Sequence, residues 1–210
     1  MAHRYDAILF DLLTGLLDSW SLWNRVAGSA EAGGRWRAEY LRLTYGCGAY
    51  RPYAELVAQA AARVGLAPAL AGDLERLWGT LRPWPGVPAV LAELKRTRRL
   101  AVVTNCSEKL GRMAAERVGV PFDAIVTSER AGFYKPHQAP YELALRELGV
   151  FADRALFVAG SGYDLFGTAR VGLPTFWHNH AGLAAPEGAP APLAESRDIG
   201  GLLALIEAPG

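Results

Sequence analysis

The residue best suited to chemistry in this sequence is Asp11, which directly follows the apolar run Ala7–Phe10. A short apolar run is typical of a buried strand, and a carboxylate at the end of such a strand is a candidate nucleophile. Two residues further on stands Leu13, so a second acid is absent there. This arrangement favours attack by a carboxylate and argues against metal-dependent phosphoryl transfer.

Three further polar clusters follow predicted strands or lie in the loops beyond them, and Thr14 stands close to Asp11. The clusters are Thr104-Asn105, Tyr134-Lys135-Pro136 with Tyr141 six residues past the lysine, and Gly160-Ser161-Gly162-Tyr163-Asp164. In a doubly wound sheet such strand ends meet at one crevice. Together they would supply a nucleophile, a hydroxyl and an amide for anions, a lysine that orients the carboxylate, and a second acid that holds the lysine. Asp164 is equally suited to capping the helix that follows it.

The elements that must position these groups alternate between strands and helices. Apolar runs predict buried parallel strands at Ala7–Phe10, Leu100–Thr104 and Leu156–Ala159, with weaker patterns at Ile125-Val126 and Thr175–Trp177. Apolar residues recur at helical spacing in residues 87–94, 141–148 and 199–206. The alternation predicts an α/β fold with a doubly wound, Rossmann-like parallel sheet.

Residues 19–82 break this alternation because they contain no convincing strand. Their apolar side chains instead fall at helical spacing, as in residues 56–64 and 70–81. Pro83-Trp84-Pro85-Gly86 has the composition of a linker and closes the segment. We therefore predict a core formed by residues 1–18 and 83–210, into which residues 19–82 insert an all-helical cap.

The bulk composition excludes several classes of protein. The 210 residues include 22 basic and 21 acidic ones, so the net charge of +1 gives no field that would attract nucleic acid or a membrane surface. No apolar stretch reaches the roughly 20 residues of a membrane helix, and the N-terminus has no secretory signal. Cys47 and Cys106 show no metal or redox spacing and are expected to be free thiols. We expect a cytoplasmic protein that binds neither nucleic acid nor membrane.

Taken in order, these motifs resemble the haloacid dehalogenase superfamily over nearly the whole chain, and most closely its 2-haloacid dehalogenase branch. The similarity rests on the first motif, the helical insert, the return at Trp84-Pro85-Gly86-Val87 and the three later clusters. That branch has Tyr-Lys-Pro with a tyrosine six residues past the lysine, as residues 134–141 do here. It also has an aromatic-Asp pair followed three residues later by glycine, as in Tyr163, Asp164 and Gly167.

The resemblance implies hydrolysis through an ester. Asp11 would attack an sp³ carbon and expel a leaving group, and water would then cleave the aspartyl ester at its carbonyl. Lys135 would orient Asp11, while Asp164, with Ser161 nearby, would hold Lys135 or the hydrolytic water. The other residues expected at the site would bind substrate or complete the lysine network: Leu13, Thr14, Trp20, Arg42, Thr104, Asn105, Tyr141 and Tyr163.

Two departures argue against a phosphatase of the same superfamily. Phosphatases carry an acid two residues past the nucleophile, where this chain has Leu13, and a magnesium-binding acid five residues before the last one, where it has Ala159. Because Mg²⁺ prefers several hard oxygen ligands, we expect no metal and no cofactor. Asp11 and Asp164 alone would hold at most a weakly bound Mg²⁺ ion.

Two other departures separate the chain from a standard dehalogenase. The usual Gly-Thr after the nucleophile is reversed to Thr14-Gly15, which changes the backbone freedom of the loop. An ungapped alignment places Thr44 where that branch has an arginine for the substrate carboxylate and the halide. Arg42 or Arg51 would have to supply this cation from a neighbouring turn.

The favoured function is metal-independent hydrolysis of a small organic acid through an Asp11 ester, with 2-haloacid dehalogenation as the leading reaction. Three alternatives stay open: a Mg²⁺-dependent phosphatase, a hydrolase of another carbon electrophile such as a strained-ring amino acid, and a catalytically silent binding protein. The resemblance also implies a homodimer.

Overall fold

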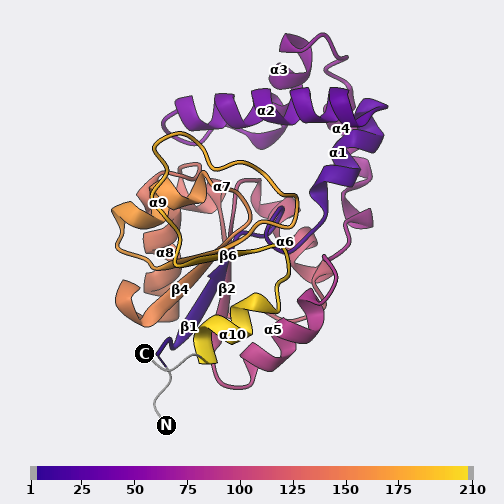
Figure 1. Cartoon of the computed structure of the whole chain (residues 1–210). Coiled ribbons are helices and arrows are strands. Elements are labelled where there is room, and N and C mark those ends of the chain that lie inside the picture. Colours follow the sequence, from indigo (N-terminus) through magenta and orange to yellow (C-terminus); the bar gives the residue numbers. More distant parts are fainter. Residues whose placement is uncertain (1–3, 208–210) are drawn as a thin grey trace.

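A computed structural model of the chain describes residues 4–207, which form a layered α/β structure (Figure 1). These residues contain six strands, all parallel, in the order β3-β2-β1-β4-β5-β6. Their bounds are β1 Ala7–Phe10, β2 Arg99–Thr104, β3 Ala124–Thr127, β4 Ala155–Ala159, β5 Thr175–His178 and β6 Ala194–Ser196. Because β1 pairs with both β2 and β4, Asp11 follows a strand in the middle of the sheet.

The sheet is apolar on both faces because helices cover both. In β1, Ile8 and Phe10 belong to one core cluster, while Ala7 and Leu9 belong to the other. Burial of apolar surface on both sides stabilises these strands and explains why their sequences read as continuous apolar runs. The first cluster includes residues of α5 (Val87–Lys95), α6 (Glu108–Arg117) and α10 (Gly201–Glu207), and the second includes residues of α8 (Gln138–Leu148) and α9 (Asp164–Arg170).

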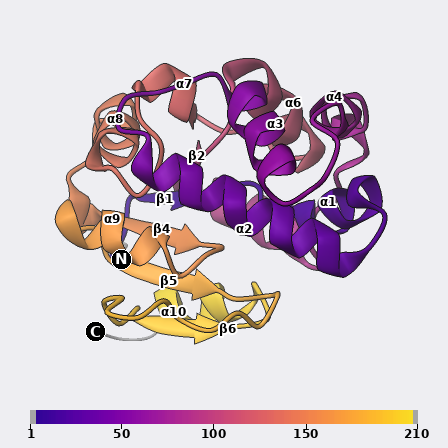
Figure 2. The same cartoon turned by 90° about the horizontal axis from the view of Figure 1, so that it is seen from above.

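Four helices follow β1 before the chain returns to the sheet. They are α1 (Ser19–Ala27), α2 (Ala30–Gly46), α3 (Tyr53–Arg63) and α4 (Leu70–Arg76), followed by the 3₁₀ turn η1 (Trp78–Thr80). They lie together beyond the carboxyl ends of the strands, and α2 runs across those ends (Figures 1 and 2). An antiparallel bridge between Leu17 and Pro83 marks where the chain leaves and rejoins the sheet layer.

These helices are held together by caps and by a cluster of aromatic side chains. Ser29 caps α2 by accepting a hydrogen bond from Ala32 N, which satisfies one of the free amides at the helix start. The rings of Trp23 and Trp36 meet edge to face with their centroids 4.7 Å apart. Trp36 Nε1 also donates to Val57 O at 2.8 Å, which ties α2 to α3. Aromatic packing of this kind joins α1, α2 and α3 into one unit.

The predicted fold class is confirmed, and each of the five predicted strands forms within one residue of its predicted bounds. The sixth, Ala194–Ser196, was not predicted because it is a half-exposed edge strand of three residues without an apolar run. The last helix begins at Gly201, so Ile199 precedes it rather than opening it. The division into a core and a cap stays a prediction.

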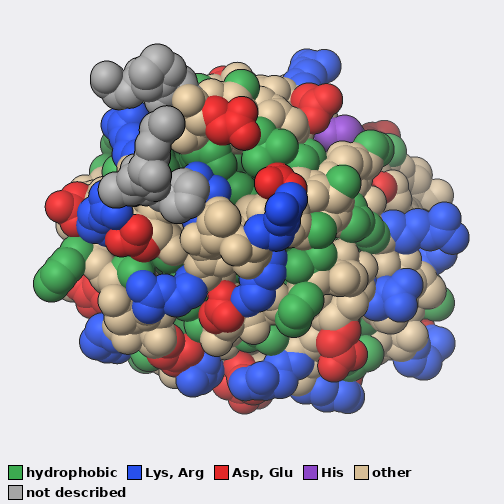
Figure 3. All heavy atoms as spheres, turned by 90° about the horizontal axis from the view of Figure 1, so that it is seen from below, with side chains coloured by type: hydrophobic (Ala, Val, Ile, Leu, Met, Phe, Trp, Pro, Cys, Tyr) green, Lys and Arg blue, Asp and Glu red, His purple; other side chains and the backbone are tan. Residues whose placement is uncertain are grey.

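On the face opposite α2, basic and acidic side chains are interspersed among small apolar patches (Figure 3). The helices described between residues 4 and 207 include none that is long and apolar enough to span a bilayer.

Candidate active site

Asp11 is buried at the carboxyl end of the central strand, with 6% of the residue exposed. Its Oδ2 accepts three hydrogen bonds from the next turn of the chain. Two come from the backbone amides of Thr14 at 3.0 Å and Gly15 at 2.8 Å, and the third comes from the Thr14 hydroxyl. The reversed order Thr14-Gly15 therefore still directs a hydroxyl and two amides at the carboxylate. Such fixed donors stabilise negative charge on this oxygen.

The carbonyl groups of the same turn are held by side chains from elsewhere. Ser19 Oγ donates to Leu13 O, and Trp84 Nε1 donates to Thr14 O at 2.9 Å. A carbonyl and the amide that follows it share one planar peptide unit and point in opposite directions. Fixing these two carbonyls therefore aims the amides of Thr14 and Gly15 at Asp11.

Lys135 joins two buried carboxylates from the loop between α7 (Ser128–Ala131) and α8. Its Nζ lies 2.8 Å from Asp11 Oδ1 and 2.9 Å from Asp164 Oδ1. Tyr141 Oη donates to Asp164 Oδ1 at 2.8 Å. Asp164 is the first residue of α9, but its carboxylate belongs to this network. The structure thus brings Asp11, Lys135, Tyr141 and Asp164 together, with Tyr141 beneath the pocket rather than in its lining.

Asn105 holds the backbone of Lys135 from both sides. Its Nδ2 donates to Lys135 O at 3.0 Å, and its Oδ1 accepts from Lys135 N at 2.7 Å. Asn105 also lines the pocket, whereas Thr104 does not. The Thr104 hydroxyl instead lies 3.7 Å from Cys106 Sγ, in a buried setting. The expected contact of Thr104 with substrate is therefore corrected: Thr104 packs behind the site, and Asn105 fixes the lysine.

Burial and neighbouring charges shift the pKa values of the ionisable groups in opposite directions. Burial alone would raise the pKa of Asp11, but Lys135, Thr14 and Gly15 outweigh it and hold that pKa below its usual value. For Asp164 burial prevails over Lys135, and the pKa is raised. Burial would lower the pKa of Lys135, but the two carboxylates outweigh it and raise that pKa. Asp11 is thus the ionised acid suited to attack, and Asp164 is the better proton acceptor.

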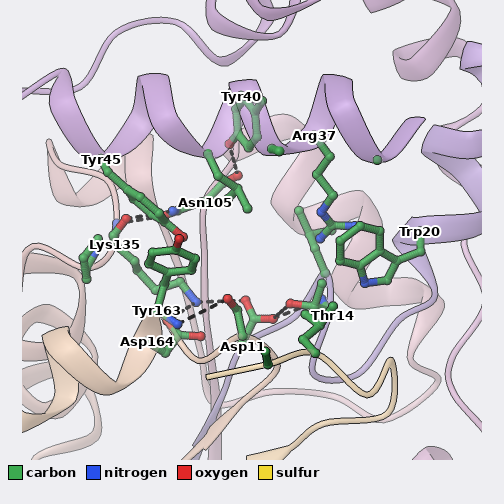
Figure 4. Close-up of a pocket in the computed structure, with 18 residues that line it drawn as sticks. Asp11, Thr14, Trp20, Arg37, Tyr40, Tyr45, Asn105, Lys135, Tyr163 and Asp164 are labelled. Carbon is green, nitrogen blue, oxygen red and sulfur yellow. Dashed lines mark hydrogen bonds and ion pairs between the residues drawn. The ribbon is translucent and has the colours of Figure 1, made fainter. Parts of the chain in front are cut away.

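A cavity of about 280 Å³ opens above these charges and beneath α2 (Figure 4). Asp11, Thr14, Lys135 and Asp164 contribute to its lining. Other expected site residues line it as well: Leu13, Trp20, Asn105, Ser161 and Tyr163. Most of the lining is apolar, which is typical of a small-molecule site with a few oriented polar groups.

Arg37 projects from α2 into this cavity, on the side of Trp20 and Thr14 (Figure 4). Its guanidinium carbon lies 4.0 Å from the centroid of the Trp20 ring, and its Nη1 donates to Ser19 Oγ at 2.9 Å. Only 8% of Arg37 is exposed. Burial outweighs the attraction of Asp11 and lowers the pKa of Arg37 from its usual value, but a guanidinium keeps its charge in proteins. A planar cation in this position is suited to binding a carboxylate or a departing anion.

The expectation that Arg42 meets the substrate was wrong. Arg42 points away from the pocket, pairs with Glu39 at 2.6 Å and has 62% of its side chain exposed. Arg51, the other candidate, is also exposed and lies near Glu55. Thr44 is buried and donates to the backbone of its own helix. The arginine that lines the cavity is therefore Arg37, which sequence reasoning missed.

A signal for Arg37 was present in the sequence. The buried stripe of α2 consists of Gly33, Trp36, Arg37, Tyr40 and Thr44. A single charge within such a stripe is expensive to bury unless it has a partner or a function. His178 is another buried polar residue near the site: it ends β5, and its Nδ1 lies 2.7 Å from Gly15 O.

The residues at this site do not fit Mg²⁺. The ion needs several oxygen ligands around it, but the ammonium group of Lys135 already lies between the carboxylates of Asp11 and Asp164. Leu13 and Ala159 stand where further acids would be needed. Within the part of the chain that the structure describes, no group of three or more His, Cys, Asp or Glu side chains is placed to hold a metal.

Comparison with known proteins assigns the chain to a family. The sequence model of the haloacid dehalogenase-like hydrolases matches residues 8–178, so this protein belongs to that family of hydrolases. The (S)-2-haloacid dehalogenase H-109 of Pseudomonas putida is 28% identical over an alignment 212 residues long with its gaps, which covers 93% of this chain and 95% of the relative. A crystal structure of an L-2-haloacid dehalogenase matches with a TM-score of 0.86 and 27% identity, covering 98% of this chain and 100% of that one.

Phosphatases are also among the relatives. The pyrimidine 5'-nucleotidase YjjG of Escherichia coli is 31% identical over 110 residues, which cover 50% of this chain and 49% of the relative. The predicted superfamily and the prediction of a hydrolase are therefore confirmed. The reaction has to be argued from the site itself.

Proposed function

We propose that the protein is a metal-independent hydrolase that displaces a leaving group from an sp³ carbon of a small organic acid through an ester on Asp11. The favoured reaction is the hydrolytic dehalogenation of a 2-haloacid. The observation that carries the proposal is the pair of environments around the Asp11 carboxylate. Oδ2 is held by Thr14 and Gly15, while Oδ1 pairs with the Lys135 ammonium, and Asp11 lines the cavity.

In the first step, Oδ1 of Asp11 attacks the carbon that bears the leaving group. The carbon–halogen bond breaks, the halide departs with the electron pair, and an ester bond forms between Oδ1 and the carbon. Arg37 is placed to bind the substrate carboxylate or the halide. No proton is needed by a halide leaving group, which agrees with Leu13 in place of an acid.

In the second step, water attacks Cγ of the Asp11 ester, and its proton passes to Asp164. Negative charge then develops on Oδ2, where the amides of Thr14 and Gly15 and the Thr14 hydroxyl already point. Collapse of this intermediate breaks the bond between Cγ and Oδ1, and the departing alkoxide oxygen takes the proton from Asp164, which releases the 2-hydroxy acid. The second proton of the water leaves Asp11 for the solvent, so that both carboxylates return to their starting state. The raised pKa of Asp164 suits it to take the proton, and its contact with Lys135 places it beside the ester.

The helical segment 19–82 would act as a cap in this mechanism. It supplies Trp20 and Arg37 to the cavity, while the nucleophile and Lys135 come from the sheet side. Closure of the cap over bound substrate would exclude bulk water and strengthen the interactions of the buried charges. The expected homodimer, and a location in the cytoplasm, remain predictions from the resemblance and composition.

The test is a single-turnover experiment in ¹⁸O-labelled water. Excess enzyme is mixed with chloroacetate, bromoacetate, fluoroacetate or 2-chloropropionate, without added metal, and the Asp11 peptide is examined by mass spectrometry after digestion. Because water attacks Cγ, heavy oxygen is expected in the Asp11 side chain of the native protein and in no peptide of Asp11→Asn.

The same samples discriminate against the alternatives. Folded protein that takes up no label with any of these acids would overturn the 2-haloacid assignment. Hydrolysis of phosphate esters that depends on added Mg²⁺ would instead indicate a phosphatase, against the poor fit of this site to that ion.

A further inference from the structure

The cavity is larger than the smallest substrates of the proposed reaction require. Its volume is about 280 Å³. A water molecule takes up about 30 Å³ in the liquid, and the bonded heavy atoms of chloroacetate, about five in number, occupy less than the same number of waters. Chloroacetate would therefore fill at most about half of this space. The remaining space needs an occupant, either solvent or a further part of the substrate.

The roof of the cavity is α2, which contributes Arg37, Tyr40 and Tyr45 to the lining. Between these larger side chains lie Gly34, Ala38 and Leu41, which follow one another at helical spacing and are either small or apolar. A Cβ atom added at Gly34 would meet no atom within 4 Å, so the space beside it is open. At Gly33, by contrast, an added Cβ would lie 2.4 Å from the side chain of Asn24. The missing side chain at Gly33 therefore lets α2 pack closely against α1, whereas the missing side chain at Gly34 leaves space in the cavity.

The walls near the mouth are apolar too. Leu183 and Ala184 line the cavity, and Ala184 and Ala38 are exposed, which places its opening between α2 and the loop that contains Ala184. Tyr163 and Tyr45, whose ring centroids lie 4.7 Å apart, also line the cavity. Among the described residues that line the cavity, the charged ones are Asp11, Lys135, Asp164 and Arg37.

We propose that the space bounded by Gly34, Ala38, Leu41 and Leu183 is a subsite for the apolar tail of the substrate acid. The inference rests on the proposed function and deepens it. With the reacting carbon at Asp11 and the carboxylate at Arg37, a tail of several carbon atoms extends along α2 toward the mouth. The substrate class is then 2-haloacids that carry an alkyl or aryl group longer than methyl.

Binding of unreactive acids tests the subsite without any turnover. The probes are acetate, butanoate, hexanoate and 3-phenylpropanoate, titrated into the native protein by calorimetry at neutral pH. Each methylene that leaves water for an apolar site strengthens binding by about two- to fourfold. Hexanoate is therefore expected to bind at least about tenfold more tightly than acetate. Equal affinities, or no binding of hexanoate at tens of millimolar, would overturn the proposal.

Variants that fill the space provide the second arm. Gly34→Leu and Ala38→Leu are each expected to abolish the advantage of hexanoate over acetate, while circular dichroism shows an unchanged fold. Gly72→Leu is the matched control, because Gly72 is an exposed residue of α4 where an added Cβ also meets nothing within 4 Å. An advantage for hexanoate that survives in both cavity variants would place its tail elsewhere and overturn the subsite.

Turnover separates failure of the subsite from failure of the proposed function. For 2-bromopropanoate, 2-bromobutanoate and 2-bromohexanoate, kcat/KM is expected to rise with chain length in the native protein and to fall with it in Gly34→Leu. Rapid turnover of the short acids alone would leave the dehalogenase assignment intact and reject the subsite. If no haloacid is turned over, the proposed function fails, and the calorimetric comparison still decides whether the subsite exists.

Discussion

Arg37 Nη1 donates a hydrogen bond to Ser19 Oγ at 2.9 Å, and Ser19 in turn donates to the backbone carbonyl of Leu13, two residues past the nucleophile. Ser19 is fully buried and is the first residue of α1, where the chain leaves the sheet. A single hydroxyl therefore links the Arg37 guanidinium to the turn whose amides donate to Asp11.

The first prediction concerns the choice of cation on α2. Replacement by Arg37→Met is expected to lower kcat/KM for 2-haloacids by about 100-fold, because a hydrogen-bonded contact to a charged group is worth about 1.5–3 kcal/mol. Arg42→Met, on the outer face of the same helix, is expected to leave kcat/KM within about twofold. Steady-state kinetics on both variants checks this, and an equal loss in the two would refute the assignment of Arg37.

The second prediction assigns Ser19 a positioning role. Ser19→Ala is expected to lower kcat/KM by about tenfold, since it removes a hydrogen-bond partner from both the Arg37 guanidinium and the Leu13 carbonyl. If Ser19 acts through Arg37, its removal in the Arg37→Met background should cost much less than in the native protein. Additive losses in this double-mutant cycle would show that Ser19 only supports the fold.

The third prediction uses the pH dependence of stability to measure what the charge of Lys135 contributes. The pKa of Asp11 is lowered in the native protein, so the stability that Asp11 contributes is present above its usual pKa and is lost as pH falls through the native value. The raised pKa of Asp164 acts in the opposite sense, because stability from that group is lost as pH rises through its native value.

Removing the lysine leaves two buried carboxylates facing one another. Lys135→Met should therefore destabilise the fold by about 3–5 kcal/mol at neutral pH. The deficit should shrink as pH falls to about 5, because the variant's acids, their pKa values raised by burial and repulsion, take up protons. Urea unfolding at both pH values measures the difference. A deficit that does not change with pH would mean that the lysine contributes packing rather than charge.

Much of the site was predictable from the sequence because of one geometric rule. Asp11, Asn105 and Asp164 each follow an apolar strand, and the ends of parallel strands meet at one edge of the sheet. Continuous apolar runs located those strands, so the convergence of the polar clusters followed from topology alone. The edge strand Ala194–Ser196 lacks such a run and could not be found in this way.

The arginine could not be placed by the same rule, because it comes from a helix outside the sheet. Residues five apart on a helix point in directions that differ by about 140°, so Arg37 and Arg42 could not both face the cavity. Which of them does depends on how α2 is rotated about its axis, and that is fixed by packing of residues such as Trp36 against α3. The sequence signal was the single charge within the buried stripe, not its distance from Asp11.

The last prediction concerns Gly160, which follows β4 and packs against the nucleophile turn. A Cβ added there would lie 2.1 Å from Gly15 N and 2.6 Å from Asp11 Oδ2, closer than any real contact allows. Gly160→Ala must therefore push the turn away, which would misalign the donors on Oδ2. We expect a loss of stability of about 1–3 kcal/mol and accumulation of the Asp11 ester, since the hydrolysis step depends on those donors.

Gly79→Ala is the matched control, because an added Cβ at this exposed residue of η1 meets nothing within 4 Å. Chemical unfolding and mass spectrometry of quenched reactions measure the two effects. If Gly160→Ala keeps both native stability and ester turnover, the amides of Thr14 and Gly15 do not need this close approach, and the oxyanion role proposed for them would have to be abandoned.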